Sequence, residues 1–299
     1  MRVLITGAAG FAGRHLAEFA SRQPGVKLFA LSRRDGDVRD CRQMEKVLRK
    51  ARPERIFHLA GFASVSRSWE DPSAAFQNNI GGTRALMDAA SRCCPKARIL
   101  VTSTAEVYGS ASGKRPFTED SPLKPMNPYA VSKIAQEFAA YQYFLTHGLH
   151  VVRTRAFNHL GPGQADAYVS ASFAKQVARI ESRRQTPVVL VGNLGAVRDF
   201  TDVRDVVRAY WLCLEKGAAG EVYNVASGRG RRIGEMLEYY LSLSAVTIKT
   251  QKDRRRLRAA DPSVLVGDAG KLRRRTGWKP VFSFEETLSD VLDEWRGKE

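Results

Sequence analysis

The sequence predicts an α/β fold in which a doubly wound parallel sheet carries a smaller, interleaved C-terminal lobe. The first half of the 299 residues alternates short apolar runs with segments of helical periodicity, a pattern typical of βαβ units around a parallel sheet. The first run leads directly into a glycine-rich turn, as expected where a first strand meets a first helix. After Asn158 the alternation loosens, but no low-complexity linker or internal repeat marks a separate module. A second domain is therefore expected to interleave with the first.

Each element of the first half follows from its local pattern. Residues 2–6 form an apolar strand, and residues 11–22 form a helix with Leu16 and Phe19 on one face. The helix that contains Tyr129 ends before Gly148, a favourable C-cap. The remaining strands are expected at residues 26–31, 55–60, 97–102 and 151–156, and the remaining helices at residues 41–51, 74–93 and 129–146.

The second half has fewer regular signals. Gly161-Pro162-Gly163 marks a turn, and residues 249–262 form a basic stretch without periodicity. Helices are expected at residues 170–183, 202–215, 233–243 and 284–296, and a strand at 221–226. The expected division is a larger domain of residues 1–158, with returning segments at about 197–226 and 282–299, and a lobe of residues 159–196 and 227–281.

Composition narrows the class of protein. The chain is 43% hydrophobic and 26% charged, as is ordinary for a globular protein. No apolar run approaches the roughly 20 residues that span a bilayer, and the first strand is too short for a signal-peptide core. The four cysteines show no metal-ligand spacing. We therefore expect a protein of the reducing cytoplasm, with no membrane partner and no bound metal.

The net charge of +17 raises the question of a nucleic-acid partner. The arginine clusters are scattered along the chain, however, and no aromatic side chains interleave them as a base-stacking platform requires. Solvated arginine-rich faces, together with attraction of a multiply phosphorylated substrate and cofactor, explain the charge more simply. We expect no nucleic-acid partner.

The glycine-rich turn predicts a dinucleotide site. Gly7, Gly10 and Gly13 allow a tight turn, a close approach of the pyrophosphate, and contact between helix and strand. The spacing Gly-x-x-Gly-x-x-Gly is one residue wider at its first gap than the usual motif. Phe11 and Ala12 begin the helix at whose N-terminus the pyrophosphate is expected.

The end of the second strand indicates which dinucleotide binds. An acidic residue there would hold a ribose 2′-hydroxyl, whereas arginine accommodates a 2′-phosphate. The sequence is Ser32-Arg33-Arg34, followed by Asp37-Val38 where the adenine is expected. This pattern favours NADP(H) over NAD(H).

Tyr129 and Lys133 are the strongest candidates for chemistry. Because they lie four apart on a helix, they share a face, where the ammonium can stabilise the phenolate and lower a pKa that starts near ~10. The fourth strand ends in Thr102-Ser103-Thr104, at the sheet edge where open α/β folds bind ligands. Thr104, with Ser103, can orient a substrate carbonyl oxygen while Tyr129 transfers the proton. Together with the dinucleotide site, these residues predict an oxidoreductase.

Glu106 is the least specific candidate. It could be a base that eliminates water from a sugar, or it could satisfy backbone donors at the strand end, and the sequence leaves both open. His58 and His159 are assigned no role, because a histidine in an apolar strand such as residues 56–60 is more often structural.

These motifs together resemble the extended short-chain dehydrogenase/reductases that act on nucleotide sugars. In the first half the resemblance rests on the glycine turn, His58-Leu59-Ala60-Gly61, Asn79-x-x-Gly82-Thr83 and Tyr129-x-x-x-Lys133. In the second half it rests on Arg198-Asp199-Phe200-x-Asp202-Val203, Tyr223-Asn224-Val225-Ala226-Ser227-Gly228 and Thr276-Gly277-Trp278-Lys279-Pro280. It implies a Rossmann-type NADP-binding domain, with Leu59, Ala60 and Gly61 at the cofactor, and a nucleotide-sugar lobe.

Within that family, residues 155–164 look most like those of GDP-4-dehydro-6-deoxy-D-mannose reductases. This resemblance implies reduction of the C4 ketone to GDP-D-rhamnose by NADPH, with Tyr129 as proton donor. It also implies a homo-oligomer, a dimer or tetramer in which the helices around Gly82 and Tyr129 pair. The substrate contacts that it implies are Asn158 and Lys175, Arg198 and Arg258 for the diphosphate, and Asp261 for the nucleotide ribose or base.

Two alternatives stay open. Thr104 and Glu106 match the catalytic threonine and glutamate of GDP-mannose 4,6-dehydratases, so the chain also resembles a dehydratase or an enzyme with both activities. Those dehydratases usually follow the Asn-His pair with Glu-Ser, whereas Leu160-Gly161 follows it here. The other alternative is a family member that has become a binding or RNA-associated protein, to which the charge of +17 would belong. The intact Tyr129, Lys133 and Thr104 argue against it.

Overall fold

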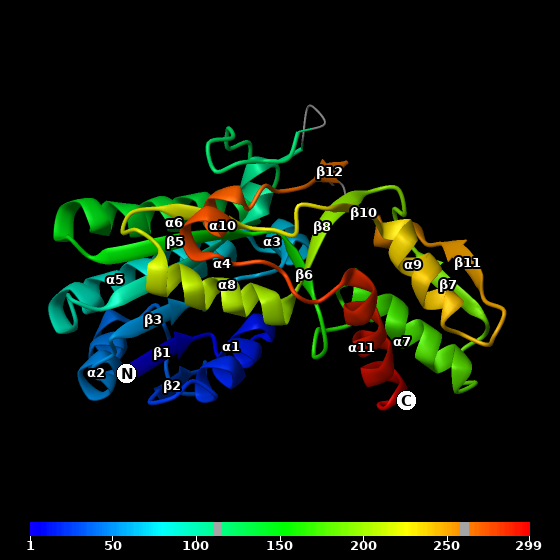
Figure 1. Cartoon of the computed structure of the whole chain (residues 1–299), viewed down its shortest axis with the longest axis horizontal. Coiled ribbons are helices and arrows are strands. Elements are labelled where there is room, and N and C mark those ends of the chain that lie inside the picture. Colours follow the sequence, from blue (N-terminus) through cyan, green and yellow to red (C-terminus); the bar gives the residue numbers. More distant parts are fainter. Residues whose placement is uncertain (111–114, 258–262) are drawn as a thin grey trace.

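The computed structural model describes residues 1–110, 115–257 and 263–299, and its centre is a six-stranded parallel sheet (Figure 1). The strand order is β2-β1-β3-β4-β5-β9, so the direction of winding reverses beside β1. The strands are β1 (Arg2–Thr6), β2 (Lys27–Leu31), β3 (Arg55–His58), β4 (Arg98–Thr104), β5 (His150–Ala156) and β9 (Val222–Val225). The predicted doubly wound α/β fold is therefore confirmed.

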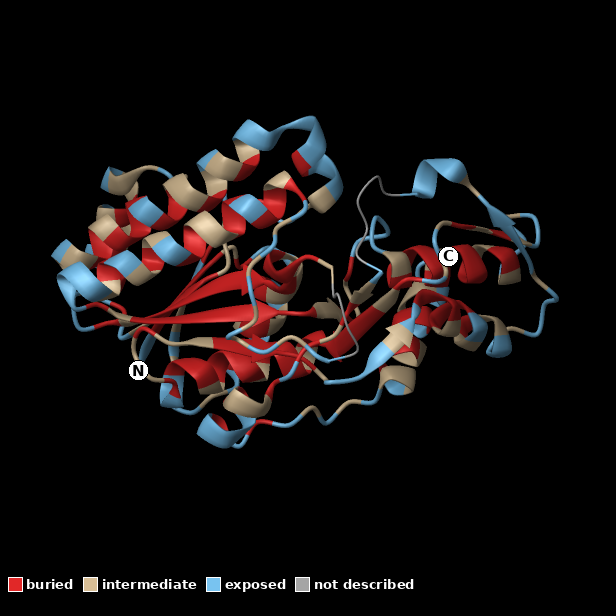
Figure 2. Cartoon of the chain, turned by 90° about the horizontal axis from the view of Figure 1, so that it is seen from above, coloured by how far each residue is buried: buried red, intermediate tan, exposed pale blue. Residues whose placement is uncertain are grey.

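Side chains along the central strands alternate between two apolar layers, because successive residues of a strand point to opposite faces. In β1, Val3 and Ile5 join one buried cluster and Leu4 joins the other. One layer packs against α1 (Phe11–Ser21), α8 (Val203–Lys216) and α10 (Gly270–Thr276), and the other against α2 (Cys41–Ala51), α5 (Gly82–Cys93) and α6 (Pro128–His147). In Figure 2 the central strands are accordingly buried, and the helices that cover them expose their outer faces, while the edge strand β2 is mostly exposed or half-buried.

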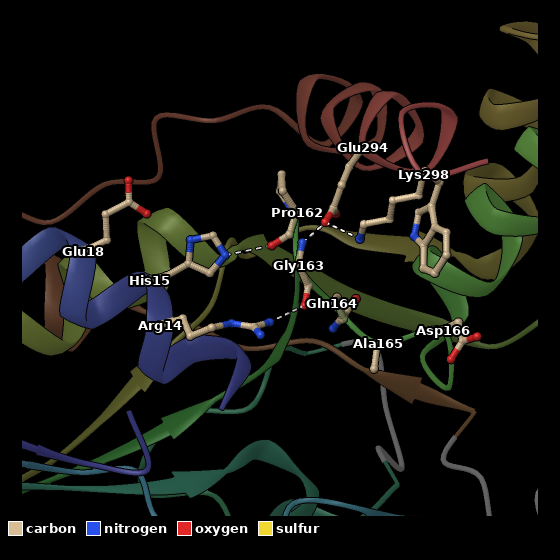
Figure 3. Close-up of a pocket in the computed structure, with 11 residues that line it drawn as sticks. Arg14, His15, Glu18, Pro162, Gly163, Gln164, Ala165, Asp166, Glu294 and Lys298 are labelled. Carbon is tan, nitrogen blue, oxygen red and sulfur yellow. Dashed lines mark hydrogen bonds and ion pairs between the residues drawn. The ribbon is translucent and has the colours of Figure 1, made fainter. Parts of the chain in front are cut away.

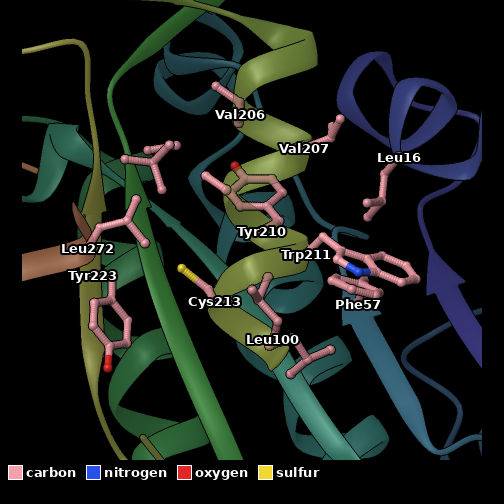
Figure 4. Close-up of a cluster of buried hydrophobic side chains, with 14 of the residues drawn as sticks. Leu16, Phe57, Leu100, Val206, Val207, Tyr210, Trp211, Cys213, Tyr223 and Leu272 are labelled. Carbon is pink, nitrogen blue, oxygen red and sulfur yellow. The ribbon is translucent and has the colours of Figure 1, made fainter. Parts of the chain in front are cut away.

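The α8 layer is built around aromatic packing. Trp211 of α8 stacks on Phe57 of β3, with ring centroids 5.6 Å apart and an interplanar angle of 15°. Leu16 of α1 lies beside this pair, and Tyr210 and Cys213 extend the cluster along α8 (Figure 4). The layer fixes α1, and with it the glycine turn, against the carboxyl end of β1.

The smaller lobe has its own sheets and its own core. Strand β8 (Val197–Asp202) pairs with β6 (Asn158–Leu160), β10 (Gly230–Arg232) and β12 (Val264–Leu265), and β7 (Val188–Val191) pairs with β11 (Lys249–Lys252). Its helices are α7 (Val169–Glu181), α9 (Ile233–Ser242) and α11 (Phe284–Arg296). Phe173, Leu237 and Leu288, from these three helices, share one buried cluster.

Several elements differ from the expectations. The helix expected at 74–93 is divided into α4 (Pro72–Phe76), a π-helical turn (Gln77–Gly81) and α5, while α3 (Val65–Glu70) was not expected. Strand β4 continues to Thr104. The 249–262 stretch, expected to be irregular, contains β11, because backbone pairing with β7 holds a strand whose residues are all exposed. Short 3-10 turns cover Ala105–Tyr108 and Arg254–Arg256.

Helix α11 also packs in a different part of the molecule from the one that the sequence predicts. The returning segment 282–299 was expected to join the larger domain, but Val291 and Leu292 pack into the core of the smaller lobe (Figure 1). Likewise β8, in the segment 197–226, lies outside the six-stranded sheet, whereas α8 and β9 pack on or within it. The domain boundaries themselves stay a prediction. In the part of the chain that is described, no helix has the length and apolarity needed to cross a membrane.

Candidate active site

The glycine turn lies at the carboxyl end of β1 and fits a dinucleotide pyrophosphate. Gly7 has φ +73°, and a Cβ there would come within 2.7 Å of the Ala60 backbone nitrogen, so only glycine lets β1 and β3 approach in this way. Gly10 is the N-cap of α1, and no side chain caps this helix end among the described residues. The N–H groups of Phe11, Ala12 and Gly13 in the first helical turn can therefore serve an anion.

The loop after β2 leaves its arginines exposed. The Asp35 carboxylate accepts from the Ser32 backbone nitrogen at 2.8 Å and from the Ser32 hydroxyl at 2.7 Å, and these hydrogen bonds lower the pKa of Asp35. Asp37 is likewise paired with Arg39 at 2.6 Å. Arg33 and Arg34 point into solvent, where a 2′-phosphate could reach them.

Two neighbouring elements complete the predicted cofactor edge. Val38 packs against α5, where a Cβ on Gly82 would lie 3.0 Å from its methyl group. Leu59, Ala60 and Gly61 follow β3, and the Ala60 backbone nitrogen donates to the Thr6 hydroxyl at 3.2 Å. The predicted cofactor residues thus border the carboxyl ends of β1, β2 and β3.

Tyr129 lies in the first turn of α6, which Asn127 caps by accepting a hydrogen bond from Ala130 at 2.8 Å. Its side chain packs with Phe62 and Ala75, and only 9% of the residue is exposed. Burial raises the pKa of the Tyr129 phenol, a hydrogen bond with Thr104 lowers it, and the Glu106 carboxylate raises it again. The phenol therefore meets the end of β4, as the sequence predicts.

Lys133 lies one turn further along α6 and is also buried. Its ammonium donates to the Thr102 carbonyl at 2.9 Å and to Gln136 Oε1 at 2.7 Å. Burial lowers the pKa of Lys133 to about 7, and Glu137 opposes that shift. One of these hydrogen bonds is to β4 and the other is to α6 itself, and neither is to Tyr129. The stabilisation of a Tyr129 phenolate by Lys133 therefore stays a prediction.

Glu106 and Ser103, the remaining candidates at the end of β4, do not share the same surroundings. Glu106 follows Thr104, accepts from the Asn127 side-chain amide at 3.2 Å, and is close enough to Tyr129 to affect its pKa. This partner is a side-chain amide, and the two roles that the sequence leaves open for Glu106, a base or an acceptor for backbone donors, stay predictions. Ser103 points to the opposite face of the strand from Thr104, and its hydroxyl is buried without a hydrogen-bond partner in the described part. A contribution of Ser103 to the same substrate oxygen stays a prediction.

Three of the predicted substrate residues are described, and they lie in the smaller lobe. Asn158 is half-buried in β6, and Arg198 is buried in β8, where it donates to the Val197 carbonyl at 2.9 Å. Lys175 of α7 pairs with Asp166 at 2.6 Å. Arg258 and Asp261, also predicted to bind the nucleotide, lie outside the described residues.

Lys175 borders a pocket of about 470 Å³ between α7, β7 and the Arg254–Arg256 turn. Arg179 and Arg256 line the same pocket, and neither was predicted. The signal for Arg179 is its position four residues after Lys175, which places both on one helix face. Arg256 gave no signal beyond the charge of its segment. The Asp166 carboxylate that pairs with Lys175 also lines the pocket, so its net charge is positive because of Arg179 and Arg256. A pocket of this size and charge suits a nucleoside diphosphate.

A second pocket, of about 710 Å³, separates α1 from α11. The turn after β6 forms one wall of it, and side chains from both helices hold the backbone of that turn (Figure 3). Arg14 donates to the Gly163 carbonyl at 2.7 Å, His15 Nε2 donates to the Pro162 carbonyl at 2.8 Å, and Glu294 accepts from the Gly163 nitrogen at 2.6 Å. Helix α1, where the sequence predicts the pyrophosphate, is thereby tied to the turn that follows Asn158.

The family model described as GDP-mannose 4,6 dehydratase matches residues 20–291. The chain belongs to this family. It is 35% identical to the GDP-6-deoxy-D-mannose reductase of Pseudomonas aeruginosa, covering 99% of this chain and 98% of that protein. It is 27% identical to GDP-mannose 4,6 dehydratase 1 of Arabidopsis thaliana, covering 97% of this chain and 88% of that protein.

Solved structures agree with the family assignment. The structure of RMD from Pseudomonas aeruginosa complexed with NADPH superposes with a TM-score of 0.93 at 33% identity and full coverage of both chains. The Thermus thermophilus UDP-glucose 4-epimerase complex with NAD gives 0.89 at 30% identity, also with full coverage of both chains. The predicted resemblance to nucleotide-sugar dehydrogenase/reductases is confirmed, and the protein is an oxidoreductase of this family.

Proposed function

We propose that this protein reduces the C4 ketone of GDP-4-dehydro-6-deoxy-D-mannose to GDP-D-rhamnose with NADPH. The observation that carries the proposal is the pairing of the Tyr129 phenol with Thr104 at the carboxyl end of β4, one helical turn from Lys133. Since burial raises the pKa of this phenol, it stays protonated at neutral pH, as a proton donor must. The identity to a GDP-6-deoxy-D-mannose reductase supports the sugar and the base.

Each residue of the site has a separate role in the proposed reaction. When bound, the nicotinamide supplies the hydride that reduces C4. Tyr129 donates its proton to the developing alkoxide, while the Thr104 hydroxyl hydrogen-bonds the same oxygen and orients it. The ammonium of Lys133 limits the cost of the phenolate that remains. The first turn of α1 holds the pyrophosphate, and Arg33 and Arg34 hold the 2′-phosphate.

The nucleotide end of the substrate is proposed to lie in the pocket of the smaller lobe. Arg179 and Arg256 give it positive charge, and Lys175 lines it in an ion pair with Asp166. The turn after β6 lies between this lobe and α1. A GDP group held there would leave the sugar to extend past Asn158 towards Tyr129.

A second candidate is the dehydratase reaction on GDP-mannose. The observation that favours it is the Glu106 carboxylate, which is fixed by Asn127 and raises the pKa of Tyr129. A carboxylate beside the proton donor is what the elimination of water from a sugar requires.

A product assay separates the two. The protein and NADPH are offered GDP-mannose alone and then the 4-keto sugar, and NADPH absorbance and sugar NMR are followed. Consumption of NADPH only with the keto sugar, giving GDP-rhamnose, supports the reductase, with Tyr129→Phe lowering kcat by about 10²–10⁴ and Tyr141→Phe on the same helix unchanged. Conversion of GDP-mannose itself, lost in Glu106→Gln, identifies the dehydratase.

We also propose that the protein is a homo-oligomer through α6. Val131, Phe138 and Leu145 recur every seven residues on this helix and are 40%, 50% and 63% exposed. An apolar stripe with this spacing suits a helix of a second copy across a two-fold axis. Phe138→Asp should convert an oligomer to a monomer in light scattering, whereas Lys46→Asp on the exposed face of α2 should not.

A further inference from the structure

A chain of buried hydrogen bonds connects Lys133 to the glycine turn through residues that the proposed reaction does not use. Gln136 is fully buried on α6, and its side-chain amide lies between Lys133 and Thr83 of α5. Thr83 in turn contacts His58 Nε2 at 2.9 Å, and His58 Nδ1 contacts the Thr6 hydroxyl at 2.8 Å. Thr6 is the residue immediately before Gly7.

The chemistry of Lys133 fixes the orientation of the Gln136 amide. An ammonium can only donate, so the amide oxygen of Gln136 must face Lys133 and its NH₂ must face Thr83. The Thr83 hydroxyl accepts from Gln136 at 2.9 Å and contacts His58 Nε2 at 2.9 Å. Because a hydroxyl can both donate and accept, either neutral tautomer of His58 fits between Thr83 and Thr6. A neutral ring fits this arrangement, and burial lowers the pKa of His58 to about 3.

The same contacts form a polar seam between two helices. Asn79, at the π-helical turn, donates to the Ser132 hydroxyl at 2.8 Å, four residues before the Thr83 and Gln136 pair. Each member is buried, so each polar atom left without a partner would be costly. The seam therefore holds the Gln136 amide in one orientation, with its oxygen aimed at the ammonium of Lys133.

We propose that Gln136 is a positioning residue for Lys133, fixing its ammonium beside Tyr129 and supporting its charged form. The inference rests on the proposed function, in which Lys133 acts as a cation next to the proton donor. The titratable groups that interact electrostatically with Lys133 are Glu137 on α6 and His58 on β3, and Tyr129 lies one helical turn before it. Glu137 already pairs with Arg155 at 2.6 Å, and His58 is held neutral. Gln136 is thus the side-chain acceptor that contacts the ammonium directly in the described structure.

Two substitutions move the Lys133 charge in opposite directions. In Gln136→Leu the ammonium loses an acceptor, so the pKa of Lys133 falls. In Gln136→Glu it gains a carboxylate, so the pKa rises. We expect shifts of about one pH unit each way, as adjacent charges and charged hydrogen bonds produce. Since the charged form is required, the alkaline limb of the kcat profile moves to lower pH in the first variant and to higher pH in the second.

Two readouts separate this proposal from the proposed function. The first is the pH profile of kcat with NADPH and the keto sugar. The second needs no turnover: ¹³Cε-lysine NMR titration of the whole protein, with the Lys133 signal assigned by its loss in Lys133→Met. If wild type lacks reductase activity but the NMR shifts appear, the reaction is wrong and the role of Gln136 stands. Gln142→Leu, an exposed glutamine on the same helix, is the matched control.

A merely structural role predicts a different result. Both Gln136 variants would then lose stability or kcat in parallel, with the Lys133 titration unmoved, and that outcome overturns the proposal. Should Gln136→Glu fail to fold, Thr83→Val provides the second test, because it frees the amide that Thr83 orients. It should lower the pKa of Lys133 by less than Gln136→Leu does, and an unchanged titration in both variants also rejects the inference.

Discussion

Replacing Glu137 by glutamine tests whether a buried ion pair holds α6 to the sheet. Glu137 is fully buried and accepts from Arg155 at 2.6 Å and 3.0 Å, and from Arg153 at 3.4 Å. Both arginines come from β5 and are themselves at least nine-tenths buried. Glu137→Gln keeps the shape of the side chain but removes the carboxylate that both guanidinium groups contact.

The expected loss is large because the remaining charges stay buried. Breaking a buried pair by removing one partner costs about 3–5 kcal/mol. At roughly 2–4 °C per kcal/mol for a chain of somewhat smaller size, the melting temperature should fall by about 10 °C. The substitution also removes the carboxylate that raises the pKa of Lys133, so that pKa should fall further below its usual range.

Scanning calorimetry and urea denaturation measure the first effect, and the lysine NMR titration measures the second. Glu238→Gln, an exposed glutamate on α9, is the control and should change the free energy of unfolding by less than about 0.5 kcal/mol. If Glu137→Gln behaves like that control, the two arginines find other acceptors and the reasoning about the pair is wrong.

Three further outcomes follow from the site. The double substitution Arg33→Ala, Arg34→Ala should weaken NADPH binding by about ten- to a hundredfold, the value of a charge-assisted hydrogen bond. The affinity for NADH, measured in the same fluorescence titrations, should not change. An equal loss of affinity for both dinucleotides would show that the arginines do not contact the 2′-phosphate. Lys175→Met should weaken GDP binding in calorimetry, most strongly at low salt. If the variant binds GDP as tightly as wild type at every salt concentration, GDP lies elsewhere. Burial raises the pKa of Asp199 to about 6, so its stabilising effect is complete below the unfolded pKa and is lost as pH rises from about 4 to 6. The unfolding free energy of Asp199→Asn relative to wild type should therefore rise across that window, by up to about 3 kcal/mol, and a constant difference in urea titrations would contradict this.

The larger domain could be predicted from sequence because its signals are local. The apolar residues of β1 are contiguous, as a strand buried on both faces requires, and the glycine turn follows directly. Tyr129 and Lys133 are recognisable because a helix fixes their relation within four residues. Each of these predictions needs only the geometry of one element.

The smaller lobe could not be predicted in the same way, because its elements depend on distant partners. Strand β11 is a row of exposed polar residues without alternation, and only its pairing with β7 makes it a strand. The apolar face of α11 shows that the helix is packed, but not that its partners are α7 and α9. The contact of Gln136 could not be predicted from the sequence either, because its acceptor Thr83 lies 53 residues away.

The electrostatics of Tyr129 bear on the direction of the reaction. A route that begins by oxidising a sugar alcohol needs this residue to accept a proton, and therefore to start as a phenolate. Burial and the nearby Glu106 carboxylate both raise the pKa of the phenol, and the Thr104 hydrogen bond opposes them. A protonated phenol beside a ketone is ready to donate, and the alkoxide that hydride addition creates is the base that takes its proton. The same carboxylate that makes a dehydratase conceivable thus favours the reductive direction at Tyr129.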